Sequence, residues 1–397
     1  MIKIENIESW NNLTKDFYVQ DLEIESKEDL KIDGTGLIGL PVGIDIHVHF
    51  RQPGYEHKED FVSGSIAALN GGVVKVLDMP NTDPITDSVK NIIIKKELAK
   101  KSQIDILVAS AITNSNIDQL KEIDEVCDAY KVFMSESFGN LSINKENIEK
   151  ALSILEEIES DKPVIFHAED PDILNENKYK KSHLEQRPPE AEGEAVRQIS
   201  IWSSIYPKLK FHVTHLSSYL ALRVLRVTKR NNLTVDTCPR YIFFDEKNEI
   251  EEWKKKVNPP LRLEGDRIEI KDAFSTGEIE MISSDHSPHT IEEKKEKRLS
   301  GMPGVQELLP SVFSLVKRGE ITWDRAIEAY HSFPSKLLNI NNVSIEDGNI
   351  IIADLKEAIF IDKNWVKSKV KWSAFENLPL YANIKYVIKD GKIMLKR

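Results

Sequence analysis

From residue 41 onward, short apolar runs rich in β-branched residues alternate with longer segments in which apolar residues recur every three or four positions. The first pattern is typical of buried strands and the second of amphipathic helices. The apolar runs cover residues 42–49, 73–79, 105–112, 129–134, 163–169, 210–216, 233–237 and 279–285. Eight strand–helix units in succession predict a parallel sheet closed into a (β/α)8, TIM-like barrel.

Segments 91–100 and 145–159 have the clearest helical spacing, with Ile, Leu and Ala among Lys and Glu. We expect them in the outer ring of helices. The alternative is an open, doubly wound sheet. Such a sheet usually has a glycine-rich phosphate turn after its first strand, whereas the first run here ends in histidines. The sequence therefore favours the barrel.

The two ends of the chain follow a different pattern. Both contain short alternating segments, and the C-terminal end has the turn pairs Asp347-Gly348 and Asp390-Gly391. Alternation with such turns predicts short antiparallel strands. We expect residues 1–40 and 345–397 to pair into one small, discontinuous β domain. Residues 41–344 would then form the barrel, inserted into that domain.

Composition narrows the class of protein. The chain has 65 acidic against 54 basic residues and a net charge of −11, which disfavours binding nucleic acid or anionic lipid as its main task. Its two cysteines, Cys127 and Cys238, form neither a disulfide framework nor a CxxC metal site. The N-terminus is charged, and no apolar run reaches the ~18 residues of a membrane span. We expect a soluble, cytoplasmic protein.

Side chains that can bind metal stand at the ends of the predicted strands. His47 and His49 are two residues apart on the first strand, so both imidazoles point the same way and can reach one ion. The fourth, fifth, sixth and eighth runs carry Lys131, His167, His215 and Asp285. Because the carboxyl ends of all barrel strands face one pocket, these residues would be neighbours. Four histidines and a carboxylate suit zinc.

Lys131 is unusual in this group, since two divalent cations would repel its ammonium. The residues alone leave two interpretations open. Lys131 is either a structural lysine with a salt bridge, or an amine of lowered pKa that has reacted with carbon dioxide to give a carbamate. A carbamate would form an anionic bridge between two metal ions.

Seven motifs extend this picture along the barrel. They are HVHFRQPG at 47–54, MPNT at 79–82, KVFMSES at 131–137, HAED at 167–170, KVNPPLR at 256–262, SSDHSPHT at 283–290 and MPG at 302–304. The set resembles the dihydroorotase family of the amidohydrolase superfamily, in order, from about residue 40 to 340. Arg51 in the first motif and Asn81 in the second make the resemblance specific.

The resemblance implies two Zn²⁺ ions per chain. His47 and His49 would bind the first ion with Asp285, and His167 and His215 the second. Lys131, carboxylated by CO₂, would bridge them, because KVFMSES resembles the lysine-bearing branch of the family. The implied substrate-binding set comprises Arg51, Asn81, Asn258 and His289, with the backbone at Pro303 and Gly304. A guanidinium beside an amide and an imidazole is suited to grip a carboxylate.

The resemblance also implies an activity, the reversible cyclisation of N-carbamoyl-L-aspartate to L-dihydroorotate in de novo pyrimidine biosynthesis. A zinc-bound hydroxide would attack the ring amide, with Asp285 as general acid and base. The substrate is then a small molecule. Aspartate transcarbamoylase is the candidate protein partner, and a homodimer is the default oligomer.

The segment from Cys238 to Tyr241 reads Cys-Pro-Arg-Tyr, where many dihydroorotases read Pro-His-His. We assign Arg240 and Tyr241 no catalytic role. One rival function is another cyclic amidase of the allantoinase or hydantoinase type, which would share the zinc ligands. Arg51 disfavours it, because those neutral rings carry no carboxylate. A second rival is a catalytically silent scaffold for aspartate transcarbamoylase, disfavoured because every expected ligand type is present.

Overall fold

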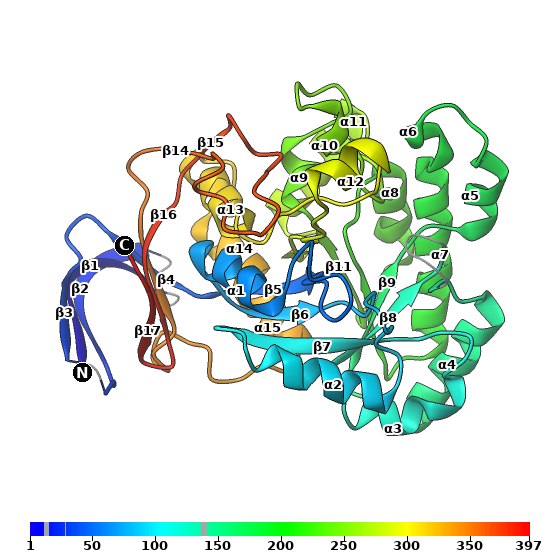
Figure 1. Ribbon diagram of the computed structural model, residues 1–397, viewed down its shortest axis with the longest axis horizontal. Helices are drawn as coiled ribbons and strands as arrows, with labels where there is room; N and C mark the ends of the chain where they lie inside the picture. Colours follow the sequence, from blue (N-terminus) through cyan, green and yellow to red (C-terminus); the bar gives the residue numbers. More distant parts are fainter. Residues whose placement is uncertain (12–15, 28, 136–140) are drawn as a thin grey trace.

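The computed structural model describes residues 1–11, 16–27, 29–135 and 141–397, and contains a barrel with a second sheet beside it (Figure 1). The barrel sheet consists of parallel strands in chain order: β5 (Gly43–Val48), β6 (Val73–Asp78), β7 (Asp105–Ala111), β8 (Ala129–Phe133), β9 (Pro163–His167), β10 (Lys210–Val213), β11 (Leu233–Thr237) and β12 (Met281–Ile282). Each lies inside one of the predicted runs.

The sheet closes between its first and last strands. Val48, the last residue of β5, bridges to His286, which follows β12, and the His49 amide donates to the His286 carbonyl at 2.8 Å. The predicted barrel is therefore confirmed over the open sheet. Two predicted strands, 210–216 and 279–285, extend past the observed ones, because β10 ends at Val213 and β12 at Ile282. His215 and Asp285 consequently lie on the loops that follow these strands.

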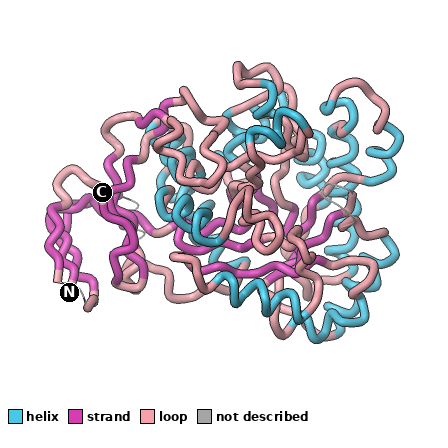
Figure 2. Tube along the Cα trace, in the orientation of Figure 1, coloured by secondary structure: helices cyan, strands magenta, loops and turns pink. Residues whose placement is uncertain are grey.

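Helices surround the barrel strands, whereas the second sheet consists of strands and loops (Figure 2). The helices, with the π-helical turn η2, are α1 (Phe61–Asn70), α2 (Val89–Ala99), η1 (Ile117–Gln119), α3 (Leu120–Asp124), α4 (Lys145–Glu157), α5 (Pro171–Asn177), α6 (His183–Gln186), α7 (Pro189–Ile205), α8 (Tyr219–Thr228), α9 (Pro239–Phe243), α10 (Glu252–Lys255), α11 (Glu264–Thr276), α12 (Ile291–Glu296), α13 (Leu308–Lys317), α14 (Trp323–Ile327), η2 (Glu328–Ser332) and α15 (Phe333–Leu337). Helices α2 and α4 confirm the two predicted from spacing. Among the described residues, no helix combines the length and apolar character needed to span a bilayer.

Helix α4 illustrates why these segments are helical. The Asn144 side chain caps its first turn by accepting from the Asn147 amide. Ile148, Leu152 and Leu155 then recur at helical spacing and are buried. Burial of this stripe against the sheet stabilises the helix more than its intrinsic propensity does.

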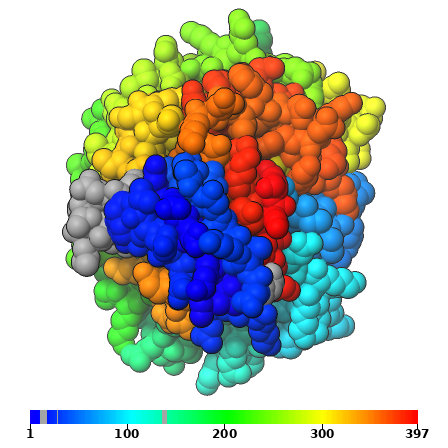
Figure 3. Space-filling model, turned by 90° about the vertical axis from the view of Figure 1, so that its left-hand side faces the viewer, coloured from blue at the N-terminus to red at the C-terminus, as the bar shows by residue number. Residues whose placement is uncertain are grey.

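The second sheet joins both ends of the chain. Its strands are β1 (Ile2–Asn11), β2 (Asp16–Ile24), β3 (Leu30–Asp33), β4 (Ile38–Pro41), β13 (Ile350–Asp354), β16 (Asn383–Lys389) and β17 (Lys392–Lys396). The order is β17-β16-β13-β4-β1-β2, with β3 on β1. Strands β4 and β13 pair antiparallel, so residues 38–41 lie beside residues 350–353. Figure 3 shows the two chain ends side by side on one face of the molecule.

The turn between β16 and β17 follows the predicted Asp390-Gly391 pair. Both residues have positive φ, 49° and 69°, as the tight turns of β-hairpins require.

The pairing of β4 with β13 shows that the pairing of the two chain ends was predicted correctly. The division into two domains, residues 1–40 plus 345–397 and residues 41–344, stays a prediction. Within 345–397, the short pair β14 (Ile359–Phe360) and β15 (Pro379–Leu380) lies outside the large sheet.

Candidate active site

A cavity lies at the carboxyl ends of the barrel strands. Its lining includes all the predicted metal ligands, namely His47, His49, Lys131, His167, His215 and Asp285. Arg51, Asn81 and Asn258 from the predicted substrate-binding set also line it. The barrel therefore brings together residues as far apart as His49 and Asp285, which are separated by 236 positions.

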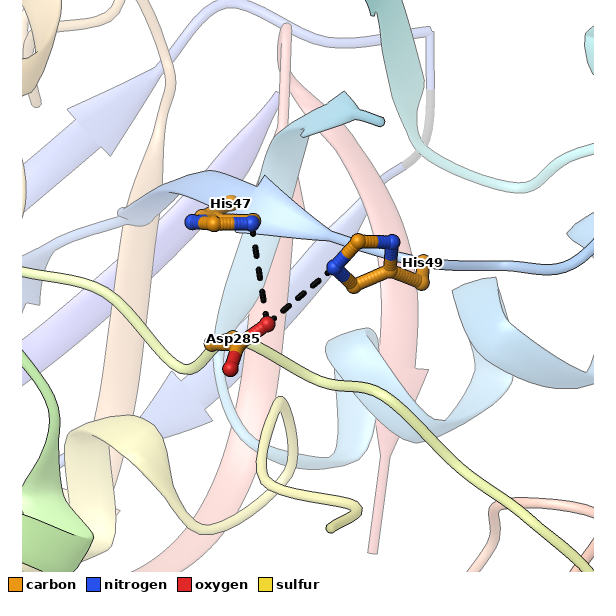
Figure 4. Close-up of side chains that lie close together, drawn as sticks. All are labelled: His47, His49 and Asp285. Carbon is orange, nitrogen blue, oxygen red and sulfur yellow. Dashed lines mark hydrogen bonds and ion pairs between the residues drawn. The ribbon is translucent and has the colours of Figure 1, made fainter. Parts of the chain in front are cut away.

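The first group of candidate ligands is His47, His49 and Asp285 (Figure 4). The two histidine Nε2 atoms lie 3.6 and 3.1 Å from Asp285 Oδ1. One ligand atom from each residue lies within 4.8 Å of the others, and all three side chains are buried. Imidazole nitrogens with a carboxylate oxygen form a donor set that zinc accepts.

Hydrogen bonds fix the tautomers of both imidazoles. His47 Nδ1 lies 2.6 Å from Thr214 Oγ1, and that hydroxyl donates its proton to Asp236 Oδ2 at 3.1 Å. The His47 ring must therefore donate its own Nδ1–H. His49 Nδ1 likewise donates to Asn81 Oδ1 at 2.5 Å. Burial lowers the pKa of both histidines, so both rings are neutral. Each presents an unprotonated Nε2 to the cavity, as a metal ligand must.

A second pair of candidate ligands is His167, the last residue of β9, and His215, two residues beyond β10. His167 Nε2 lies 2.6 Å from Glu169 Oε2, which turns Nδ1 toward His215 Nε2 at 3.0 Å. Two nitrogens on one tetrahedral zinc ion, each at ~2.05 Å, lie roughly 3.3 Å apart. The spacing of this pair is close to that value, so the two rings fit a shared ion.

Glu169 is itself held by a charged partner. The Arg187 guanidinium donates to both of its oxygens, with Nε 3.0 Å from Oε1. Burial opposes the charged form of Glu169, but Arg187 and His167 outweigh it and lower the pKa of the carboxyl. Glu169 therefore remains a carboxylate that can orient the His167 ring.

Lys131, in β8, lines the same cavity as both histidine pairs, and its charge contributes to the lowered pKa of His47, His167 and His215. The side chain is fully buried, and its Nζ has no hydrogen-bond partner among the described residues. Burial lowers the pKa of the amine to about 7. Its other contact is with the Phe133 ring, whose centroid lies 5.4 Å away. A buried amino group without a hydrogen-bond partner is costly, so this atom fits a role toward a bound group.

Asp285 follows β12 with a left-handed backbone, at φ 41°. On the side away from the histidines, Arg240 contacts its Oδ2. Burial opposes the charged form, but the Arg240 guanidinium outweighs it and holds the pKa of the carboxyl well below its usual range. Asp285 is therefore a carboxylate, with Oδ1 facing both histidines.

Arg51 brings a buried positive charge into the same cavity. Its Nε donates to the Pro288 carbonyl at 3.2 Å, and burial lowers its pKa to about 10, so the guanidinium stays charged. His289 lies behind it. Its Nδ1 accepts from Lys58 Nζ at 3.2 Å and its Nε2–H donates to the Ser300 carbonyl at 3.0 Å. Arg51 Nη2 lies 3.3 Å from His289 Nε2, so the guanidinium packs beside a neutral imidazole whose two nitrogens have other hydrogen-bond partners.

The other predicted substrate-binding residues differ in their placement. Asn258 lines the cavity, and its Oδ1 has no hydrogen-bond partner among the described residues. Asn81 lines it too, but its carbonyl is engaged by His49. His289, Pro303 and Gly304 are buried outside the lining, and the Gly304 amide donates to His286 Nδ1 at 3.1 Å. Direct contact of these residues with a substrate stays a prediction.

Four residues that contact candidate ligands have no role predicted from the sequence, namely Glu169, Thr214, Asp236 and Arg240. The sequence held one indication for Glu169. It stands two positions after His167, and side chains two apart in an extended segment point to the same side. The sequence held none for the others, since their contacts cross from one strand or loop to another.

Comparison with known families agrees with this geometry. The model of the amidohydrolase family matches residues 38–394, and the chain belongs to this family. Among curated relatives, it is 32% identical to a dihydroorotase of Acetivibrio thermocellus, over 95% of this chain and 91% of that one. It is 31% identical to a dihydroorotase of Methanosarcina acetivorans, over 92% of this chain and 82% of that one.

A solved structure confirms the fold. The L-hydantoinase (dihydropyrimidinase) of Arthrobacter aurescens superposes with a TM-score of 0.91, covering 100% of this chain and 96% of that one, at 18% identity. A barrel with a second sheet is therefore shared far beyond recognisable sequence identity.

Proposed function

We propose that this protein is a cyclic amide hydrolase that holds two zinc ions and interconverts L-dihydroorotate and N-carbamoyl-L-aspartate, as a dihydroorotase in pyrimidine biosynthesis. The observation that carries the proposal is the buried Arg51 guanidinium in one cavity with the candidate metal ligands. A ring amide held over the metal site with a carboxylate in reach of Arg51 matches dihydroorotate. The curated relatives named dihydroorotase support the same substrate.

The proposed metal ligands are His47, His49 and Asp285 for one ion and His167 and His215 for the other. Lys131 would bridge them once its neutral amine adds to carbon dioxide and loses one proton, leaving a carbamate. The buried amine has no hydrogen-bond partner among the described residues and a pKa of about 7, and both properties support this step. When bound, two divalent ions at these ligands would lower the pKa of a water molecule and polarise the ring amide carbonyl.

The chain's own residues would then orient the substrate and move a proton. Arg51 and Asn258 would hold the substrate carboxylate by charge-assisted and neutral hydrogen bonds. In the hydrolytic direction, Asp285 Oδ1 would accept a proton from the attacking water and return it to the ring nitrogen as the amide bond breaks. In the cyclising direction it would take the proton from the ureido nitrogen, and water would be lost.

The test is turnover by purified, zinc-loaded protein in bicarbonate buffer, followed in both directions. We expect chelator-sensitive interconversion of dihydroorotate and N-carbamoyl-L-aspartate. 5,6-Dihydrouracil, hydantoin and allantoin serve as substrates without the carboxylate. Faster turnover of one of these would contradict the proposal in favour of another cyclic amidase. Stoichiometric zinc with no turnover of any substrate would favour the silent scaffold. Association with aspartate transcarbamoylase and a homodimer stay predictions.

The variant Arg51→Met tests the binding of the substrate carboxylate separately from the cleavage of the ring amide. Losing a charge-assisted hydrogen bond of about 1.5–3 kcal/mol would lower kcat/KM for dihydroorotate roughly 10- to 150-fold, mainly through KM. Turnover of 5,6-dihydrouracil, which has no carboxylate, is the internal control and should change little. An unchanged KM for dihydroorotate would contradict the role of Arg51.

A further inference from the structure

Arg240, which sequence analysis assigned no catalytic role, contacts Asp285 on the side opposite the histidines. Its Nη2 contacts Asp285 Oδ2, and its Nη1 lies 3.2 Å from the Ser284 carbonyl and 3.4 Å from the Asp285 carbonyl. His47 and His49 both face the other oxygen, Oδ1. The two carboxylate oxygens therefore have separate partners.

The guanidinium is held in place by its surroundings. Arg240 belongs to α9 and is only 2% exposed. The Tyr241 ring centroid lies 5.0 Å from its Cζ, and the Tyr241 hydroxyl donates to the Pro259 carbonyl at 2.6 Å. A buried arginine fixed in this way is a rigid partner for a carboxylate, because little side-chain freedom is lost when the contact forms.

Arg240 also holds the backbone that carries the carboxylate. Asp285 has φ 41°, a conformation that residues other than glycine adopt only with support. Arg240 binds the carbonyls on both sides of this strained point, and Ser287 Oγ donates to the Asp285 carbonyl at 3.0 Å. One side chain thus contacts both the main chain and the side chain of the candidate ligand.

We propose that Arg240 is a positioning residue for Asp285, which occupies Oδ2 and leaves Oδ1 as the single oxygen directed at the metal site. This inference rests on the metal centre of the proposed function, but not on the identity of the substrate. The inference predicts the direction in which metal affinity changes when Arg240 is replaced. A positive charge near two divalent ions weakens their binding by repulsion, so removing the charge alone would tighten it. Losing the orientation of a ligand would weaken it.

The test compares Arg240→Met and Arg240→Lys with wild-type protein. We expect Arg240→Met to weaken Co²⁺ and Zn²⁺ binding by about 10- to 100-fold, measured by competition with a chelator. The visible absorption of the cobalt-loaded protein should change, because it reports the geometry of the ligands. In turnover, kcat should fall more than KM rises. Arg240→Lys, which keeps the charge and one donor group, should be intermediate and keeps the test decisive if Arg240→Met does not fold.

Arg325→Met is the matched control, since Arg325 is a buried arginine that donates to the carbonyls of Phe274, Ile279 and Glu280. It should leave metal affinity and the cobalt spectrum unchanged. Unchanged or tighter metal binding in both Arg240 variants, with an unchanged spectrum, would overturn the inference. Wild-type protein that binds metal but hydrolyses only another cyclic amide would contradict the proposed substrate and leave the role of Arg240 standing.

Discussion

Hydrogen bonds to polar side chains orient three of the candidate imidazole ligands. Thr214, which itself binds Asp236, contacts His47. Asn81 contacts His49, and Glu169 contacts His167. Such partners determine which nitrogen is unprotonated, and their loss typically costs metal affinity. At the scale of single residues, the site is therefore defined by hydrogen bonds as much as by ligands.

Thr214→Val tests this directly. Valine keeps the shape of the side chain but removes the hydroxyl that joins His47 to Asp236. We expect metal affinity to fall by about 10- to 100-fold and the free energy of unfolding to fall by about 1–3 kcal/mol, because buried polar groups lose a partner. Chelator competition and urea unfolding measure the two effects.

Thr237→Val is the matched control. Thr237 is also buried, and its hydroxyl donates to the main-chain carbonyl of Leu216 at 2.8 Å rather than to the side chain of a candidate ligand. It should lose stability on the same scale and keep its metal affinity. Wild-type metal affinity in Thr214→Val would contradict the role given to Thr214.

At the scale of elements, the segments that flank α12 form part of the cavity wall. Lys294, in α12, donates to the carbonyls of Lys256, Leu299 and Gly301 at 2.8, 3.1 and 2.9 Å. Gly301 lines the cavity, and Lys256 is two residues from Asn258, which also lines it. One buried amine thus ties two separate loops to a short helix.

Lys294 predicts a pH dependence of stability. Burial lowers its pKa to about 7, below the ~10.4 of an unfolded chain. The unfolded chain therefore binds the proton more tightly, so the contribution of this group to stability rises with pH from about 7 to about 10. Relative to Lys294→Met, the free energy of unfolding of wild-type protein should rise by up to about 1.4 kcal/mol per pH unit.

Urea unfolding at several pH values in this range measures that difference. Lys295→Met changes an exposed lysine on the same helix and should keep the wild-type profile. A difference between wild type and Lys294→Met that stays constant or falls with pH would contradict the lowered pKa of Lys294.

At the scale of the whole molecule, distant segments hold the barrel and the chain ends together. Strands β4 and β13 pair across more than 300 positions. Glu59, buried beside the start of α1, accepts from the Ser368 hydroxyl and from the Lys369 amide at 3.2 Å, and lies 3.3 Å from His286 Nε2. The C-terminal segment therefore supports the loops at the mouth of the barrel, and we expect the two parts to depend on each other for stability.

A double-mutant cycle of Glu59→Gln and Ser368→Ala measures this dependence. Because the two groups share a buried, charge-assisted hydrogen bond, their coupling energy in urea unfolding should be about 1–3 kcal/mol. Ser368→Ala combined with Glu122→Gln, an exposed residue outside this contact, should be additive. Additive effects in the first cycle would show that the chain end does not stabilise the barrel through Glu59.

The sequence by itself determined the strands, their order and the residues that could bind metal. A buried strand and an amphipathic helix each depend on spacing between near neighbours, so β5 to β12, α2 and α4 could be predicted. The hairpin of β16 and β17 could be predicted because Asp390-Gly391 suits positive φ. Only the tertiary structure decided the rest. His215 and Asp285 stand on loops with left-handed backbones, and Thr214, Asp236 and Arg240 reach their partners across strands. These contacts depend on register and barrel closure, which bring together residues that no local pattern relates.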